Sequence, residues 1–324
     1  MSKKDEPKDI LDAINAEFGE GTLVAMAEPP ARQYDAVSTG SLNLDKALGI
    51  GGLPRGRIVE VYGPESSGKT TIALQCIVSA QRTDPLRCAF IDAEHALDLT
   101  YAKALGVDLQ RLLVSQPDNG EQGLEVCERL VRSEQCSVIV VDSVAALAPK
   151  EELEGAMGDV QVGLQARMMS KALRKLVGTV SATNTLLLFI NQTRSKIGGY
   201  GNPETTSGGN ALKFYASVRV RITRTGSNSA AGEAVSNTTK AKVVKNKCAP
   251  PFREAEFEIE FGKGVSLAGE VLDHAIEAGL VIKAGAWFSL PDGTRLGQGR
   301  EKAKQCLIDQ PDLLQALLEG VSTK

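Results

Sequence analysis

The chain has 324 residues, of which 42% are hydrophobic, and a formal net charge of −3 at pH 7. A chain of this length and composition can bury a substantial core and is expected to form about two domains. The charged first residues, MSKKDEPKDI, contain no apolar signal core, and no apolar run approaches the length of a membrane span. We therefore expect a cytoplasmic protein without a membrane partner. Six cysteines without a C-x-x-C pair and only two histidines argue against a disulfide framework and a histidine-rich metal site.

The low overall charge conceals two basic stretches. Residues 194–224 contain six basic side chains and one acidic side chain, Glu204. Residues 283–304 contain five basic side chains and two acidic ones. Because a charged run is usually a solvated face, neither stretch alone establishes a nucleic-acid partner.

The first segment, residues 1–31, carries one short predicted helix. Ile10, Ile14 and Phe18 recur at helical spacing, and Gly19 is expected to end the helix. A helix of this size is too small to fold alone, so we expect it to dock on another surface and serve oligomerisation.

Residues 32–265 alternate apolar, β-branched runs with helical stretches, which predicts a parallel sheet covered by helices on both faces. The expected parallel strands are 58–62, 88–92, 138–142 and 185–191. Alternating apolar and polar residues then predict an antiparallel extension of the sheet, with strands at 217–224, 240–245 and 254–260.

Residues 266–324 predict a small α+β domain, with a helix near 270–278, a hairpin around 291–293 and two short helices. The expected fold class is therefore α/β. It comprises a mostly parallel twisted sheet extended by antiparallel strands, a short N-terminal helical segment and a small C-terminal domain.

The segment GPESSGKT, residues 63–70, matches the phosphate-loop pattern G-x-x-x-x-G-K-[ST] between a predicted strand and a predicted helix. Glycines there let backbone N–H groups surround a phosphate, Lys69 can neutralise the β and γ oxygens, and Thr70 can bind Mg²⁺. This motif places the core among the P-loop NTPases. The predicted nucleotide-contacting residues are Gly63, Pro64, Glu65, Ser66, Ser67, Gly68, Lys69, Thr70 and Thr71.

Polar residues follow the other predicted parallel strands, where ligands of such sheets bind. Asp142 fits the carboxylate that holds Mg²⁺ through water, and Glu94 fits the base or the positioning group for the attacking water. Gln192 fits a sensor of the γ-phosphate. Simple helix caps are the alternative for the acidic residues.

Together these residues predict nucleoside triphosphate hydrolysis by positioning and charge stabilisation. The guanine-recognition pattern N-K-x-D is absent, because Cys248 and Ala249 follow Asn246-Lys247, so ATP with Mg²⁺ is the expected cofactor. A small-molecule kinase on the same fold is the alternative from a different class, although the sequence has no arginine-rich lid pattern.

Five blocks of the sequence closely resemble the bacterial RecA recombinase family: residues 38–42, 63–70, 90–98, 140–147 and 208–217. The resemblance extends from about Phe18 to Asp312. It implies a DNA-dependent ATPase that forms helical filaments on single-stranded DNA and pairs that strand with a homologous duplex, in recombination and repair. It leaves open a bacterial or a phage origin, a DNA-repair paralogue of the same ATPase group, and an autocleaving repressor of the SOS response as a further partner.

The resemblance also implies roles for individual residues. Glu94 matches the catalytic glutamate, and Gln192 matches the residue that links the ATP state to DNA binding. Tyr101 and Phe261 match aromatic residues that pack on adenine, and Asp98 matches an acceptor for its amino group. Lys245 and Lys247 match lysines that reach ATP across the subunit interface.

Three groups of residues match DNA-contacting positions of the family. A first loop near 154–162 leads into a helix with basic residues at helical spacing, a second loop follows Gln192, and the small domain carries a surface that gathers duplex DNA. The implied contacts are Arg167, Ser170, Arg174, Arg194, Lys196, Ile197, Gly198, Gly208, Gly209, Asn210, Lys283, Arg300 and Lys302.

The sequence departs from the family pattern at a few places. Ser195 stands where methionine is typical, the second loop is one residue shorter around Gly199, Val162 replaces a methionine, and Phe261 replaces a tyrosine. The last residues, 301–324, contain three basic and four acidic side chains, so we expect no acidic tail that restrains duplex binding.

Overall fold

The computed structural model describes residues 9–25, 34–156, 163–195, 204–230 and 233–322, and the chain divides into two compact units, 1–34 and 35–324. The first unit contains α1 (Ile10–Phe18), whose bounds are those expected from the sequence. Asp9 caps the helix by accepting a hydrogen bond from the backbone N–H of Leu11. The Asn15 side chain bonds both the N–H and the C=O of Leu23, which folds the chain back after the helix.

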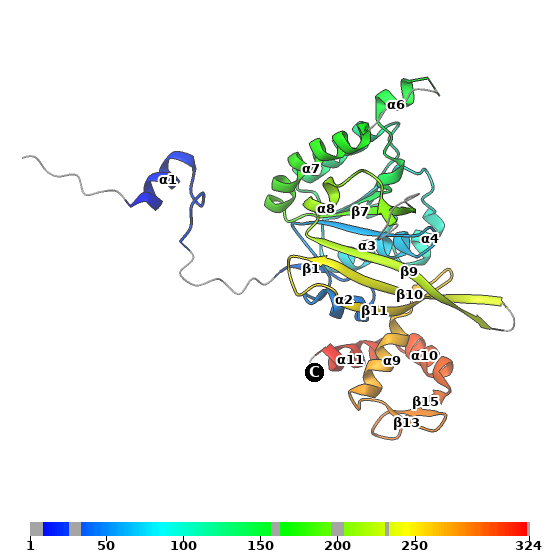
Figure 1. Cartoon of the computed structure of the whole chain (residues 1–324). Helices are drawn as coiled ribbons and strands as arrows, with labels where there is room; N and C mark the ends of the chain where they lie inside the picture. The colour runs from blue at the N-terminus through cyan, green and yellow to red at the C-terminus, as the bar shows by residue number, and fades with distance from the viewer. Residues whose placement is uncertain (1–8, 26–33, 157–162, 196–203, 231–232, 323–324) are drawn as a thin grey trace, which may run out of the picture. The chain divides into compact units, whose positions relative to one another are not determined.

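The second unit is built on a ten-stranded sheet, and its elements are shown in Figure 1. Its helices are α2 (Leu42–Leu48), α3 (Lys69–Thr83), α4 (Leu99–Ala104), α5 (Gly120–Arg132), α6 (Lys150–Glu154), α7 (Leu164–Ala182), α8 (Ala211–Tyr215), α9 (Leu267–Glu277), α10 (Arg300–Asp309) and α11 (Pro311–Ser322), with two 3₁₀ turns, η1 (Leu109–Arg111) and η2 (Val144–Ala146).

The strands of the second unit form the central sheet and two small sheets. They are β1 (Ala36–Val37), β2 (Leu53–Pro54), β3 (Ile58–Gly63), β4 (Arg87–Asp92), β5 (Leu112–Ser115), β6 (Cys136–Asp142), β7 (Leu186–Ser195), β8 (Glu204–Thr206), β9 (Val218–Ala230), β10 (Glu233–Asn246), β11 (Glu254–Glu260), β12 (Gly264–Val265), β13 (Ile282–Ala284), β14 (Trp287–Ser289) and β15 (Arg295–Gln298).

The central sheet has the order β12-β11-β10-β9-β3-β7-β6-β4-β5, with β8 paired to β7. Neighbours from β9 to β5 are parallel, whereas β9 to β12 pair antiparallel. The expected fold class is therefore confirmed: a mostly parallel sheet carries an antiparallel extension and a small C-terminal domain. The α/β class follows from near-continuous apolar strands, which are stable only when both faces are covered.

Alternate residues of each parallel strand enter two separate cores. Phe90 and Val140 point to the face covered by α2, α3 and α4, whereas Ile91 and Ile139 point to the face covered by α5, α7 and α8. This period of two is the pleat of a strand, and it explains why β3, β4 and β6 have almost no exposed residue. The helices thus hold the carboxyl ends of the parallel strands at one edge.

The small C-terminal domain has its own core. Side chains of α9, α10 and α11 pack with Phe288 of β14 and Leu296 of β15. Figure 1 shows α7 and α8 on one side of the central strands and this domain beyond β11. The predicted helix and hairpin of this segment are present, although α9 begins at Leu267, three residues earlier than expected.

Two features of the sheet were not expected from the sequence. The edge strand β5 was not predicted, since it is short and half exposed. The strand expected at 185–191 continues to Ser195 as β7, where it pairs antiparallel with β8. No described helix combines the length and apolarity that a membrane crossing requires.

Candidate nucleotide site and DNA-facing surface

The phosphate loop lies between β3 and α3, and two of its glycines are required by close packing. A Cβ at Gly63 would lie 2.0 Å from the carbonyl oxygen of Ile222, and a Cβ at Gly68 would lie 2.3 Å from Cδ1 of Ile259. Gly68 also has a φ of +93°, in the left-handed region that favours glycine, and it is the N-cap of α3. The loop amides therefore meet at a helix N-terminus, which suits an anionic phosphate.

Lys69 and Thr70 begin α3, and their side chains have different partners. The buried Lys69 donates from Nζ to the carbonyl oxygens of Gly63 at 3.2 Å and Pro64 at 2.5 Å. Burial lowers the pKa of Lys69, while the negative charges of Asp142 and Glu94 act against that change. The ammonium is thus held over the loop where phosphate oxygens would bind.

Thr70 and Asp142, the two predicted Mg²⁺ ligands, lie in direct contact. The hydroxyl of Thr70 donates to Oδ2 of Asp142 at 2.7 Å. Burial raises the pKa of Asp142 to about 6, although the Thr70 hydrogen bond opposes this rise. A hydroxyl and a carboxylate at the entrance of a phosphate loop are the donor set that Mg²⁺ takes in such sites, so the residues fit this ion.

Glu94 receives hydrogen bonds from two neighbouring strand ends. The Gln192 side chain donates from Nε2 to Oε1 of Glu94 at 2.8 Å, and the hydroxyl of Ser143 donates to the same oxygen. Asp92 has a structural role instead, because its carboxylate accepts the backbone N–H groups of Ala96 and Leu97. The three predicted strand ends therefore converge, and Ser143 is a partner whose role the sequence did not reveal.

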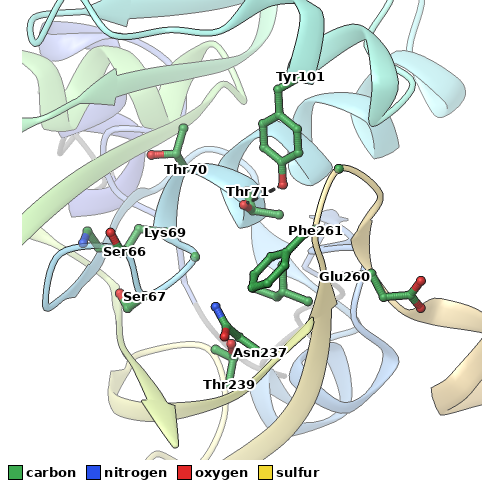
Figure 2. Close-up of a pocket in the computed structure, with 13 residues that line it drawn as sticks. Ser66, Ser67, Lys69, Thr70, Thr71, Tyr101, Asn237, Thr239, Glu260 and Phe261 are labelled. Carbon is green, nitrogen blue, oxygen red and sulfur yellow. Dashed lines mark hydrogen bonds between the residues drawn. The ribbon is translucent and has the colours of Figure 1, made fainter. Parts of the chain in front are cut away.

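A pocket of about 370 Å³ continues from the phosphate loop toward Tyr101 and Phe261, as Figure 2 shows. The hydroxyl of Tyr101 lies 3.0 Å from that of Thr71, and Phe261 is 50% exposed. Asn237 and Thr239 of β10 also line the pocket. Neither was predicted, because only the antiparallel pairing of β10 with β11 brings Asn237 opposite Ile259 and Thr239 opposite Phe257.

Three predicted nucleotide contacts lie elsewhere on the described chain. Asp98 caps α4 by accepting the N–H groups of Thr100 and Tyr101. Lys245 donates from Nζ to the carbonyl oxygens of Lys213 and Phe214, and Lys247 is exposed. None of these three lines the pocket of this chain, so their roles stay predictions.

The two ends of the second predicted DNA loop are joined by buried polar groups. Asn191 donates from Nδ2 to Glu60 at 2.9 Å and to the carbonyl oxygen of Ser207 at 3.1 Å, and its Oδ1 accepts the N–H of Gln192. Arg219 pairs with the other Glu60 oxygen and lies 4.6 Å from the Tyr62 ring centroid. A buried network thus fixes the loop ends beside Gln192.

The predicted DNA-contacting residues of α7 share one surface. Arg167, Ser170 and Arg174 line a groove of about 390 Å³ together with Ala166 and Lys171.

The glycines at the far end of the second loop pack against the same helix. A Cβ at Gly209 would lie 2.7 Å from Cβ of Ala166, and a Cβ at Gly208 would lie 2.7 Å from Val144. Asn210 is exposed at the start of α8. The two predicted DNA elements therefore meet at the start of α7, where Gln165 also accepts the N–H of Gly208.

Several predictions for the two loops lie outside the described residues or side chains. Lys196, Ile197, Gly198, Gly199 and Val162 belong to undescribed segments. For Arg194 and Ser195, only the backbone pairing with β8 is described.

The three predicted duplex-gathering residues differ in their surroundings. Lys283 lies 5.7 Å above the Phe288 ring centroid, and Lys302 is exposed on α10. Arg300 instead forms ion pairs with Asp273 at 2.9 Å and Glu258 at 3.7 Å. These carboxylates raise the pKa of Arg300. The ion pairs join α10 to β11 and α9, a structural role that the sequence did not indicate.

The fold and site define a P-loop NTPase in which the glutamate after β4 accepts hydrogen bonds from Gln192 on β7 and from Ser143 after β6. The family model described as the RecA N-terminal domain matches residues 6–266, and the RecA C-terminal domain matches residues 269–324. The chain belongs to the RecA family of recombination and repair proteins, which are DNA-dependent ATPases.

Comparison with individual relatives agrees with this membership. The chain is 61% identical to Protein RecA of Gluconacetobacter polyoxogenes, over 94% of this chain and 87% of that protein. It is 57% identical to Protein RecA of Acidiphilium cryptum, over 99% of this chain and 94% of that protein. A crystal structure of the RadB recombinase aligns with this chain with a TM-score of 0.54 at 22% sequence identity. The alignment covers 71% of this chain and 98% of the RadB chain, which shows that the two share a fold.

Proposed function

We propose that the chain binds ATP with Mg²⁺ in the pocket beside the phosphate loop and hydrolyses it when bound to single-stranded DNA. The observation that carries this proposal is the 2.8 Å hydrogen bond from Gln192 to Glu94. Glu94 lies in the turn after β4, and Gln192 lies on β7, the strand that leads into the second predicted DNA loop. A change at the γ-phosphate can therefore reach that loop through one hydrogen bond.

The residues around the pocket take complementary parts in this reaction. The loop from Gly63 to Thr71 holds the phosphates, Lys69 neutralises charge on their oxygens, and Glu94 accepts a proton from the attacking water. Thr70 and Asp142 hold Mg²⁺, which supplies further neutralisation of phosphate charge. Tyr101 and Phe261 stack on adenine.

The chain binds the phosphate backbone of DNA, so binding does not depend on the base sequence. Arg167, Ser170 and Arg174 on α7 contact phosphates, together with Gly208, Gly209 and the basic second loop. Lys283 and Lys302 of the small domain gather duplex DNA for homologous pairing and strand exchange. Copies of the chain assemble as a filament, with Lys245 and Lys247 reaching the ATP of a neighbouring copy and the segment 1–31 docking on it. This assembly works in the cytoplasm, as family membership supports.

The measurement that tests the proposal is ATP hydrolysis with and without single-stranded DNA. We expect hydrolysis to be slow alone and strongly stimulated by DNA. A rate that DNA leaves unchanged would contradict the proposal and return the small-molecule kinase to consideration.

A further inference from the structure

A buried lysine joins the small C-terminal domain to the strand that borders the nucleotide pocket. Lys304 of α10 has 8% of its side chain exposed, and its Nζ lies 2.8 Å from Glu301, 3.2 Å from Glu260 and 3.9 Å from Glu258. Glu301 belongs to the same helix, whereas Glu258 and Glu260 belong to β11. The ammonium therefore bridges the small domain and the central sheet.

Glu260 belongs to two cavities at once. It ends β11 directly before Phe261 and lines the nucleotide pocket. It also lines a second cavity, of about 530 Å³, between α10 and the ends of β9 and β10. Of the residues that the structure describes, only Glu260 lines both cavities. Figure 2 shows its carboxylate turned away from Phe261 and Lys69.

Of the four glutamates of β11, the two that lie near Lys304, Glu258 and Glu260, differ in how strongly they are held. Glu258 accepts hydrogen bonds from Asn228 at 3.0 Å and from Ser236, and it also pairs with Arg300. Glu260 has one other cation among the described residues, Lys263, at 4.0 Å and 70% exposed. An exposed pair of this kind contributes little. Loss of the Lys304 charge would therefore leave Glu258 in place and release Glu260.

Without the Lys304 charge, electrostatic repulsion from Glu258 would displace the Glu260 carboxylate. Side chains at positions i and i+2 of a strand share one face, so Glu258 and Glu260 repel one another when no cation lies between them. Removal of one partner from a buried ion pair leaves a charge without compensation. The direction open to Glu260 is the nucleotide pocket that it already lines.

We propose that Lys304 is a positioning residue for nucleotide binding. Its ammonium holds the Glu260 carboxylate on the side of the small domain, so that docking of this domain keeps a negative charge away from the anionic nucleotide. The inference rests on the proposed function, since it takes the pocket as the ATP site. It makes the C-terminal domain a determinant of ATP affinity as well as a DNA-gathering module.

The test compares charge variants of the full chain by titration with a fluorescent ATP analogue, followed by steady-state hydrolysis on single-stranded DNA. We expect Lys304→Met to raise the dissociation constant and the KM for ATP about fivefold, with kcat within about twofold. Lys304→Arg keeps the charge and should stay within about twofold of the unsubstituted protein. Lys263→Met, which removes the exposed cation from the same carboxylate, is the matched control and should also change affinity less than about twofold.

A second substitution separates charge from packing. Adding Glu260→Gln to Lys304→Met removes the uncompensated charge and should restore the affinity to within about twofold of the unsubstituted protein. The inference is overturned if Lys304→Met binds ATP normally, or if Glu260→Gln does not restore a loss. If the unsubstituted protein itself failed to bind the analogue, the proposed function would fail before any variant was compared.

Discussion

Glu94 has one carboxylate oxygen engaged and one available. Ser143 and Gln192 both donate to Oε1. Within the described part of the chain, no hydrogen bond is made to Oε2, which can accept a proton from water. A general base must combine such access with a fixed orientation, and the two donors provide the orientation. At the residue scale, therefore, the geometry of Glu94 fits the role of general base that we propose for it.

We expect Glu94→Gln to retain ATP binding and DNA binding while hydrolysis slows about 10²- to 10⁴-fold, because an amide cannot accept the proton. The measurement is kcat on single-stranded DNA beside a nucleotide titration of the same preparation. The amide oxygen can still accept from Ser143, so the fold should be unaffected. Loss of ATP binding together with hydrolysis would remove Glu94 from the role of base.

Glu270 of α9 is a second buried carboxyl, remote from the chemistry. It accepts hydrogen bonds from the Ser41 hydroxyl at 2.8 Å, the Leu42 N–H at 2.5 Å and the Asn43 N–H at 3.3 Å, which ties the small domain to the start of α2. Burial raises the pKa of Glu270 to about 7 in spite of these donors. Its stabilising effect is therefore fully present below its ordinary value of 4.5 and is lost as the pH rises to about 7.

We expect the free energy of unfolding to fall as the pH rises from about 5 to about 7. In Glu270→Gln this fall should be smaller, by at most roughly 3 kcal/mol over the whole range. Gln can keep the accepted hydrogen bonds without the charge. Burial also raises the pKa of Asp45 and that of Asp142, each to about 6, so part of the pH dependence, with the same sign, should remain. Urea unfolding at several pH values measures this, with the exposed Asp312→Asn as control. An unaltered slope in Glu270→Gln would contradict the assignment.

At the element scale, the site is assembled by strand ends and by one long helix. Parallel strands gather their carboxyl ends at one edge, so the sequence alone could predict that Glu94, Asp142 and Gln192 meet. Asn237 and Thr239 could not be predicted in the same way, because their position depends on the register of β10 against β11. The ion pairs of Arg300 depend in turn on how α10 packs beside β11. The periodicity of the sequence predicts helices and strands. It does not predict these interactions, because they join residues that are distant in the sequence.

Helix α7 offers a test of the DNA-facing surface. Arg174 lines the groove with Arg167 and Ser170, whereas Lys175 pairs with Glu128 at 3.6 Å and faces α5. We expect Arg174→Ala to weaken single-strand binding equally for different sequences and to reduce the salt slope by about 0.7 for each phosphate that is no longer neutralised. Lys175→Ala is the matched control and should leave the slope unchanged. A weakening that varied with DNA sequence would indicate base readout instead.

At the scale of the whole molecule, the described residues of the unit 1–34 leave apolar side chains of α1 exposed. Helix α1 has nine residues, none of them buried, and Ile10 and Phe18 are 68% and 67% exposed. An isolated helix shorter than about 12 residues is marginal in water, so tertiary or intermolecular packing must stabilise it. A neighbouring copy of the chain is the partner that the proposed filament supplies.

We expect the double substitution Ile10→Ser and Phe18→Ser to abolish filament assembly on single-stranded DNA with ATP, because serine cannot bury apolar surface against the neighbouring copy. ATP binding by the single chain and the thermal midpoint of the second unit should stay unchanged, since these residues belong to a separate compact unit. Glu17→Ser, an exposed polar position on the same helix, is the control and should assemble normally. Sedimentation or light scattering measures assembly, and filaments of normal length from the double variant would show that α1 does not join neighbouring copies.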